Sequence, residues 1–490
     1  MDATVYDLIR QTLDSKEPAT LHMNVDFQCG VQKIIWSVWD HLVGPELKFI
    51  WNVNAKCENE TSPISANNNC SSSQSSRSGN SDLCITSDFE NLSIDADGDR
   101  KPNDLDDWTI EDSKIDHCTS SRYATVYSLS SEIFNDNTEF KLICISDKSV
   151  AVASYIYSAD KKSDDIYRAR YSICLILDEN RVTEFLMRKL FTDAYFEDTI
   201  SRLKAASIIE NDEEMLNRLS NHFVEYLSIL SKLNSHLCLH LSSPFKISDT
   251  LLSKADLSKN QYLRQAITSH LQCKGYTVVL GTDLRVVNRM VRTLAFFEPE
   301  DHLRMCLLSA EDNTYCPYLK IQGLHKNELG FVVKHAKYSP WPVCLIDADS
   351  QTVLTTLPLR KHLAAKRKAL EIDLRLILDA SVDTSLIFAN FESSNTCDTI
   401  VADFLAQMDF LPYDDTVRLG FVSTLSTSLK FKSLALNSYA RFVSDKGKNR
   451  TSLDLKDLVS AVSLENKDDF LIVLAVADFY QPDLAKFLLL

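Results

Sequence analysis

The first part of the chain carries short runs rich in β-branched and aromatic residues, separated in several places by Asn and Asp. These runs are Val31–Trp39, Leu47–Val53, Ala124–Leu129, Phe140–Ile145, Val150–Tyr157 and Tyr171–Leu177. The pattern is typical of strands joined by turns. We therefore predict a mainly antiparallel sheet, with a Gly44-Pro45 turn between its first two strands and a helix over Val182–Ala206 after its last.

Further along, apolar residues recur at helical spacing. Asp212–Leu233 carries one continuous apolar stripe, which predicts an amphipathic helix, and a second such helix covers Ser258–Lys274, where Gly275 is placed to end it. The strand-like Tyr276–Leu280 and a helix from Leu284 follow, so we predict an α/β layer with a parallel strand. Other predicted strands are Met305–Leu308, Tyr318–Ile321 and Phe331–Val333, and predicted helices are 398–410, 416–442, 453–462 and 468–480.

These elements predict an α/β (α+β) chain of three domains. A sheet-and-helix domain covers 27–205, a central α/β domain covers 212–368, and a mainly helical region covers 370–490. The length of 490 residues agrees with that number at about 150 residues per domain.

A long acidic insert interrupts the N-terminal sheet at about 54–121. Between Asp82 and Asp116 it holds 12 acidic and 3 basic residues. Because so polar a segment cannot bury enough apolar surface to offset its ordering entropy, we predict that it is disordered. Asp95, Asp97, Gly98 and Asp99 resemble part of a calcium loop, but Ser93 would be the first ligand, so we prefer a solvated acidic linker.

The composition argues against several enzyme classes. The chain has only 10 glycines, and none of them belongs to GxGxxG, GxxxxGK[ST] or GxSxG. These motifs need glycine where the backbone closely approaches a phosphate or turns sharply. A P-loop NTPase, a common kinase, a dinucleotide-binding dehydrogenase and an α/β-hydrolase are therefore disfavoured, and we predict no cofactor. The net charge of −16 also disfavours nucleic acid as a primary partner.

The 13 cysteines show neither a disulfide framework nor CxxC spacing, so we predict reduced thiols in the cytosol, with Cys306 and Cys316 buried. His236, Cys238 and His240 alternate, and on a strand they could present three zinc ligands. Buried structural residues are the preferred interpretation of these three. We find no signal-peptide pattern and no apolar stretch of the length that spans a bilayer.

Two sets of basic residues could contact a partner. The first could meet an acidic partner or a membrane surface, or could form the solvated face of a helix joining two domains, which we prefer. It consists of Arg360, Lys361, His362, Lys366, Arg367 and Lys368. The second set, Arg285, Arg289 and Arg292, could pair with carboxylates on a partner or, as we favour, within the chain. Trp36, Trp39 and Trp51 are predicted to be core or interface anchors.

Several segments resemble the DENN family. Trp39 and Asp40, then Gly44, Pro45 and Trp51, resemble the opening of its longin-type module, where a strand runs into a Gly-Pro turn and returns. Further resemblance to a member of this family lies in Ala266–Gln272, Thr277–Gly281, Val287–Leu294, Ile321–Leu324, Tyr338–Pro342 and Ile472–Leu488. These blocks include Gly281, Asn288, Arg292 and Gly323, which we predict to be structural. The acidic insert and the first 25 residues or so depart from the family.

The resemblance implies a longin-type (upstream DENN) domain at 27–205, a central DENN domain at 212–368 and a helical downstream DENN region at 370–490. It implies a cytoplasmic regulator of Rab- or Arf-type small GTPases, recruited to lysosomes, endosomes or autophagosomes. Its expected partners are a second DENN protein (of the Smith–Magenis chromosome-region type) and a WD-repeat protein.

Two functions are compatible with this resemblance. Guanine-nucleotide exchange needs a broad surface that favours one state of the GTPase, and no catalytic residue, metal or cofactor. The alternative is a non-catalytic scaffold in a GTPase-activating complex whose arginine finger comes from the partner DENN protein.

Overall fold

The computed structural model describes residues 18–25, 29–40, 44–55, 116–129, 137–145, 149–160, 168–209, 211–242, 246–378, 388–394, 397–445, 458–460, 462–464 and 466–489. One compact unit comprises residues 1–56 and 120–490, and all contacts discussed below lie within it. Of the second unit, 57–119, only the start of a helix is described. The acidic insert as far as residue 115, with the predicted calcium-type loop, lies outside the described residues.

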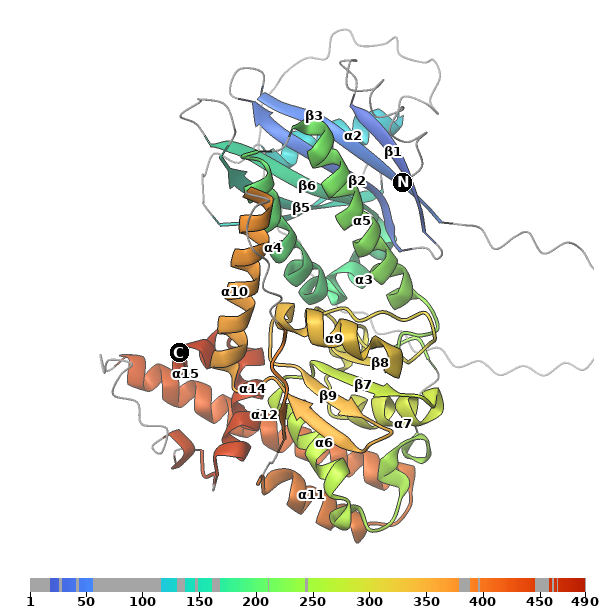
Figure 1. Cartoon of the computed structure of the whole chain (residues 1–490), viewed down its shortest axis with the longest axis vertical. Coiled ribbons are helices and arrows are strands. Elements are labelled where there is room, and N and C mark those ends of the chain that lie inside the picture. The colour runs from blue at the N-terminus through green and yellow to red at the C-terminus, as the bar shows by residue number, and fades with distance from the viewer. Residues whose placement is uncertain are drawn as a thin grey trace, which may run out of the picture. The chain divides into compact units, whose positions relative to one another are not determined.

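A six-stranded sheet forms the N-terminal part (Figure 1). Its strands are β1 (Ala19–Val25), β2 (Val31–Asp40), β3 (Gly44–Ala55), β4 (Glu139–Ile145), β5 (Val150–Ala159) and β6 (Ala169–Asp178), in the order β1-β3-β2-β6-β5-β4. All neighbours are antiparallel except β1 and β3. The ring of Trp36 stacks on Phe49 and Tyr171 at centroid distances of 5.3 and 5.2 Å, which ties β2 to the strands on either side.

The predicted strand Ala124–Leu129 is wrong, because these residues end a helix, α2 (Asp116–Leu129). The helix lies on the sheet through small polar side chains: the Thr125 hydroxyl is 3.1 Å from that of Ser37, and the Ser128 hydroxyl is 2.6 Å from that of Ser154. These buried positions have helical spacing but are not apolar, so a search for apolar periodicity misses them. The predicted end of the insert, at about 121, therefore falls inside α2.

Three helices follow the sheet: α3 (Val182–Met187), α4 (Lys189–Ala206) and α5 (Asp212–Asn234). The first two replace the single helix predicted over Val182–Ala206, with the break at Arg188, whose guanidinium donates to the carbonyl of Leu233 at 3.0 Å. The apolar stripe of α5 covers the sheet. Trp51 meets Phe223 edge-on at 4.8 Å, and its indole N–H donates to the Ser220 hydroxyl at 2.9 Å.

The second sheet has the order β11-β10-β9-β7-β8. Its parallel centre is β7 (Thr277–Gly281), β8 (Ile321–His325) and β9 (Cys344–Asp347), with β10 (Thr352–Thr355) and β11 (Glu392–Ser393) antiparallel at one edge. The flanking helices are α6 (Gln261–Gln272), α7 (Leu284–Ala295), α8 (Glu300–Leu303) and α9 (Leu329–His335). This confirms the predicted mixed α/β architecture.

Three predicted strands of this region differ in the structure. Phe331–Val333 belongs to helix α9, where only Val332 of the three is buried, and so short an apolar run does not distinguish a helix from a strand. Met305–Leu308 forms only isolated bridges at Leu307. The strand predicted at Tyr318–Ile321 begins at Ile321.

The C-terminal part is helical, with α10 (Leu359–Leu378), α11 (Ile400–Asp409), α12 (Asp415–Asp445), α14 (Lys467–Tyr480) and α15 (Leu484–Leu489). Of the helix predicted at 453–462, residues 458–460 are described as helical and residue 462 as a turn. These helices share one apolar core with the central sheet region, which includes Leu271, Ile346, Phe404, Leu436 and Phe470. Among the described helices, none is both long enough and apolar enough to cross a membrane.

Arg418 joins α12 to the central region. Its side chain is fully buried and donates to the backbone carbonyls of Leu252, Leu411 and Pro412. Among the described residues it has no carboxylate within ion-pair distance, so its charge is stabilised by these carbonyl dipoles and by the Tyr413 ring, whose centre lies 4.2 Å from the guanidinium carbon. Removing the guanidinium would leave several buried acceptors without a donor.

Candidate functional site

Four of the predicted motif residues meet at the turn between β2 and β3. Trp39 pairs with Pro45 and Asp40 with Gly44 in the strand register, and Gly44 takes a φ of 91°. Gly44 and Pro45 thus open β3 and do not form a separate turn. Trp51 lies apart from them, fully buried under α5.

The other motif residues surround helix α7. The Asn288 side-chain oxygen accepts the Ser309 backbone N–H at 2.6 Å, and a Cβ at Gly323 would lie 2.8 Å from that same nitrogen. A Cβ at Gly281 would lie 2.8 Å from the Val287 side chain. Arg292 is half-buried and makes no ion pair with the described residues. Gly281 and Gly323 therefore allow β7 and β8 to pack closely on α7, and Asn288 of α7 binds the backbone beside them.

His236, Cys238 and His240 do not lie on a strand. They occupy consecutive turns after α5, and the buried Cys238 thiol lies 3.8 Å from the carbonyls of Leu303 and Arg304. Within the described ranges, no three His, Cys, Asp or Glu residues are grouped so that they could hold a metal ion. The zinc alternative therefore lacks the one-sided strand geometry on which it depended.

The first basic set does not form one surface. His362 lies on the buried side of α10, and burial lowers its pKa to about 4. Its Nε2 lies 3.0 Å from the Ser339 carbonyl, and its Nδ1 lies 3.1 Å from the Thr356 hydroxyl. Lys366 pairs with Asp198 of α4 at 3.4 Å. These two were wrongly included in a solvated face, because a helix of this length turns some basic residues inward.

The remaining basic residues are solvent-facing. Arg360, Arg367 and Lys368 are exposed on α10 and make no ion pair with described residues. In the second set, Arg285 pairs with Asp283 of its own helix cap at 3.1 Å, as favoured. Arg289 instead donates to the Thr250 carbonyl at 3.0 Å.

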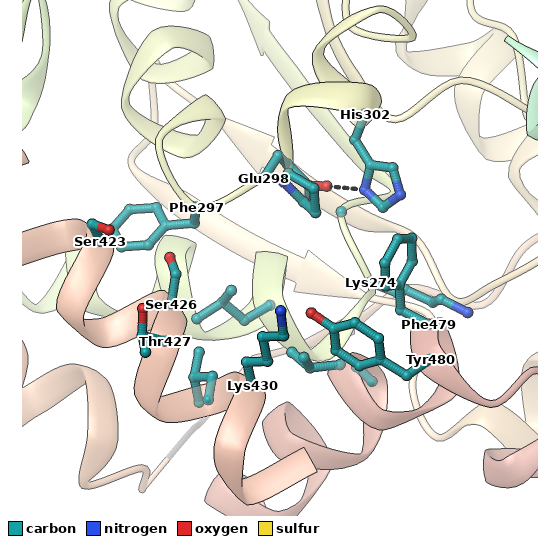
Figure 2. Close-up of a pocket in the computed structure, with 16 residues that line it drawn as sticks. Lys274, Phe297, Glu298, His302, Ser423, Ser426, Thr427, Lys430, Phe479 and Tyr480 are labelled. Carbon is teal, nitrogen blue, oxygen red and sulfur yellow. Dashed lines mark hydrogen bonds and ion pairs between the residues drawn. The ribbon is translucent and has the colours of Figure 1, made fainter. Parts of the chain in front are cut away.

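A hollow of about 290 Å³ lies between α12, α14 and the segment before α8 (Figure 2). Apolar side chains make most of its walls: Leu271, Phe297, Leu429, Ala475, Val476 and Phe479. Its polar lining includes Ser423, Ser426, Thr427 and Lys430 along α12, and Tyr480 at the end of α14. Sequence reasoning missed this site, because its walls come from segments more than a hundred residues apart.

The inner wall of the hollow contains a buried carboxylate, Glu298. Its Oε2 lies 2.5 Å from His302 Nδ1, and its Oε1 lies 3.3 Å from His270 Nε2. Burial alone would raise the pKa of Glu298, but the contacts with the two histidines outweigh it and hold that pKa well below its ordinary value. Burial also lowers the pKa of His302, although its contact with Glu298 acts in the opposite direction.

Two lysines complete this cluster, the half-buried Lys274 and the buried Lys320. Lys274 pairs with Asp478 of α14 at 2.5 Å, and Lys320 donates to the carbonyl of Lys274 at 2.7 Å. Burial lowers the pKa of Lys320 to about 8. Lys274 and the next residue, Gly275, take φ angles of 53° and 80°, which turns the chain after α6 so that Gly275 faces Glu298. Both carboxylates are thus engaged: Glu298 binds histidines within the central region, and Asp478 links that region to α14 through Lys274.

Helix α12 also presents an exposed apolar face. Val417, Thr424 and Phe431 are spaced by seven residues, or about two turns, and are all exposed. Phe431 is 67% exposed, and just before the helix Phe410 and Tyr413 are 89% and 66% exposed. Only Phe431 of these three aromatic residues lies on α12 itself, since Phe410 and Tyr413 precede the helix. Large aromatic side chains with this much exposure are unusual on a surface that contacts only water.

Comparison with known proteins identifies the relatives of this chain. The C9orf72-like protein family matches residues 126–362. The human protein named guanine nucleotide exchange factor C9orf72 is 25% identical over 394 residues, which covers 71% of this chain and 80% of the relative, and the mouse homolog gives the same values. This chain resembles the C9orf72-like proteins.

The match places the family resemblance on the structure. The matched residues 126–362 run from the last turn of α2 to the first turn of α10, and so include Gly281, Asn288, Arg292 and Gly323. Trp39 to Trp51 lie before this stretch. The six-stranded sheet, the central α/β region and the C-terminal helices are consistent with a longin and DENN architecture.

Proposed function

We propose that this chain regulates Rab- or Arf-type small GTPases as a guanine-nucleotide exchange factor. The observation that carries the proposal is its similarity over 394 residues to proteins named guanine nucleotide exchange factor C9orf72. Exchange requires a surface that binds the nucleotide-free GTPase more tightly than the nucleotide-bound form, so that the population shifts toward release. It requires no bond-making group in the regulator.

We further propose that the protein acts in a complex with a second DENN protein and a WD-repeat protein, on lysosomes, endosomes or autophagosomes. The exposed apolar face of α12 supports a protein partner, because Phe410, Tyr413 and Phe431 are largely exposed in the single chain. Aromatic residues of this kind often carry most of the binding energy of an interface. The second DENN protein is the partner that we assign to this face. The three domains, at 27–205, 212–368 and 370–490, form part of the same proposal.

A non-catalytic scaffold in a GTPase-activating complex is the second candidate. An arginine finger must reach the transferring phosphate from a projecting position. Arg360 and Arg367 are exposed without an ion pair among the described residues, but both lie within helix α10, and Arg285 is bound to Asp283. This arrangement favours a finger supplied by the partner chain.

Release of a fluorescent GDP analogue and hydrolysis of GTP, measured on a panel of Rab and Arf proteins, separate the two candidates. Faster release with this chain alone supports exchange. Faster hydrolysis only with the partner DENN protein, abolished by one arginine-to-alanine substitution in the partner, supports the scaffold. If neither rate changes on any GTPase of the panel, both proposals are wrong.

The α12 face is tested in the same system with Phe431→Ala. We expect weaker binding of the DENN partner, by roughly tenfold or more for an aromatic anchor. Val224→Ala is the matched control, because Val224 is 53% exposed but lies on α5. Equal partner affinity of the two variants would contradict the assignment of this face.

A further inference from the structure

The hollow between α12, α14 and the segment before α8 has the size and lining of a small-ligand site. Its volume of about 290 Å³ is at the lower end of the range of about 300–1,000 Å³ found for ligand pockets. Leu271, Phe297 and Phe479 provide flat or branched apolar surfaces. A body of one or two fused rings would fill this space.

The free polar groups that face the hollow are hydrogen-bond donors or hydroxyls. Figure 2 shows the ends of Lys430 and Tyr480 directed into the hollow, on the side opposite Phe297 and Glu298. The Lys430 ammonium lies 5.7 Å from the centre of the Tyr480 ring, and it has no carboxylate within ion-pair distance among the described residues. The Tyr480 hydroxyl likewise has no hydrogen bond to a described residue.

The carboxylates near the hollow are already occupied. Both oxygens of Glu298 face histidines, and Asp478 is bound to Lys274. The side chain of Glu298 is only 6% exposed. A cationic ligand would therefore find no free carboxylate among the described lining residues, whereas an anionic group could bind the ammonium of Lys430 and the hydroxyl of Tyr480.

We propose that this hollow binds a small organic anion with an apolar ring system, its anionic group held by Lys430 and Tyr480. Its walls come from the central region (Leu271, Phe297) and from the C-terminal helices (Leu429, Ala475, Phe479). A bound molecule would contact both and stabilise their association, since a ligand that binds only the folded state raises its stability.

Two fluorescent probes test the proposal on the full chain. 8-Anilinonaphthalene-1-sulfonate carries a sulfonate on its rings, and N-phenyl-1-naphthylamine has the same rings without the charge. We expect saturable binding of the sulfonate at one site and weaker binding of the neutral probe. Equal affinity for both would overturn the assignment of an anion site.

Substitutions then locate the bound probe. Lys430→Met should weaken binding of the sulfonate by about tenfold, the order expected for a hydrogen bond to a charged group, and should leave the neutral probe unchanged. Lys432→Met is the matched control, because Lys432 lies on the same helix, two residues away, and does not line the hollow. Ser426→Trp should fill the hollow and block both probes.

Two results would contradict the proposed anion site. If Lys430→Met and Lys432→Met bind the sulfonate alike, Lys430 does not hold the anionic group and the proposal is wrong. If Ser426→Trp retains its circular dichroism spectrum and still binds the sulfonate with the affinity of the unaltered chain, the probe binds elsewhere and the proposal also fails.

Discussion

Gly275 is the position where one added carbon should disturb the buried charge cluster most directly. It has a φ of 80°, and a Cβ built there would lie 2.0 Å from Glu298 Oε1 and 2.6 Å from Glu298 Cδ. Glu298 cannot move away freely, because its oxygens lie 2.5 Å from His302 and 3.3 Å from His270. Gly275→Ala therefore has to strain the backbone and displace the carboxylate from at least one histidine.

The expected loss of stability follows from these two effects. A residue other than glycine in the left-handed region costs about 1–2 kcal/mol. A buried hydrogen bond to a charged group is worth about 1.5–3 kcal/mol. Together they predict that Gly275→Ala lowers the free energy of unfolding by roughly 3–5 kcal/mol. Urea unfolding followed by far-ultraviolet circular dichroism and by tryptophan fluorescence measures it.

Gly330→Ala is the matched control. Gly330 lies in α9, and a Cβ there would meet no atom within 4 Å, so this substitution should be neutral or stabilise by up to about 1 kcal/mol. Adding Glu298→Ala to Gly275→Ala removes the atoms that collide, so the double variant should be more stable than the two single effects predict. A loss for Gly275→Ala that is no larger than that of Gly330→Ala, or strict additivity with Glu298→Ala, would refute the reasoning.

Three further predictions concern buried polar groups. Burial lowers the pKa of His362 to about 4, below its unfolded value of about 6.5, so stability that is present above pH 6.5 is lost as the pH falls toward 4, by at most about 3 kcal/mol. The urea midpoint of a His362→Gln variant should therefore fall less between pH 6.5 and pH 4 than that of the unaltered chain. Arg418→Leu leaves several buried carbonyls without a donor and should lower the free energy of unfolding in urea by about 3 kcal/mol or more. Arg441→Leu, at an exposed site on the same helix, should change that free energy by no more than about 0.5 kcal/mol. Trp51→Phe loses a buried hydrogen bond of 2.9 Å and should cost about 1–3 kcal/mol, and thermal unfolding should show a smaller loss for Trp39→Phe, which is half-buried.

Much of the fold could be predicted where one side of an element is apolar. The stripe of α5 shows this clearly, because burial of one face requires the helical period that the sequence displays. Strands β5 and β6 are buried on both faces, and the sequence indicates them by short runs rich in β-branched and aromatic residues. Helix α2 was missed because Ser37, Thr125 and Ser128 replace apolar contacts by hydroxyl contacts. Strand β1 was missed because it pairs in parallel with β3, a long-range contact that no local pattern specifies.

The hollow and its buried cluster could not be predicted from spacing. Its charged groups come from Lys274, Glu298, Lys320, Lys430 and Asp478, which only the folded chain brings near one another. A local signal did exist at Gly275, which the sequence marks as a helix terminator. The signal specified the turn after α6 but gave no information about the carboxylate that faces it, because Glu298 approaches from a separate segment.

The few glycines of this chain support a function through surfaces for a reason beyond the missing motifs. A glycine that cradles a phosphate leaves open space beside its Cα for the ligand. At Gly275, Gly281 and Gly323 that space is already filled by Glu298, Val287 and Ser309, at 2.0–2.8 Å from the position of a Cβ. These glycines therefore bring protein segments into close contact and offer no room to a nucleotide. This agrees with the proposed exchange function, in which contacts on the GTPase surface change the shape of its own nucleotide pocket.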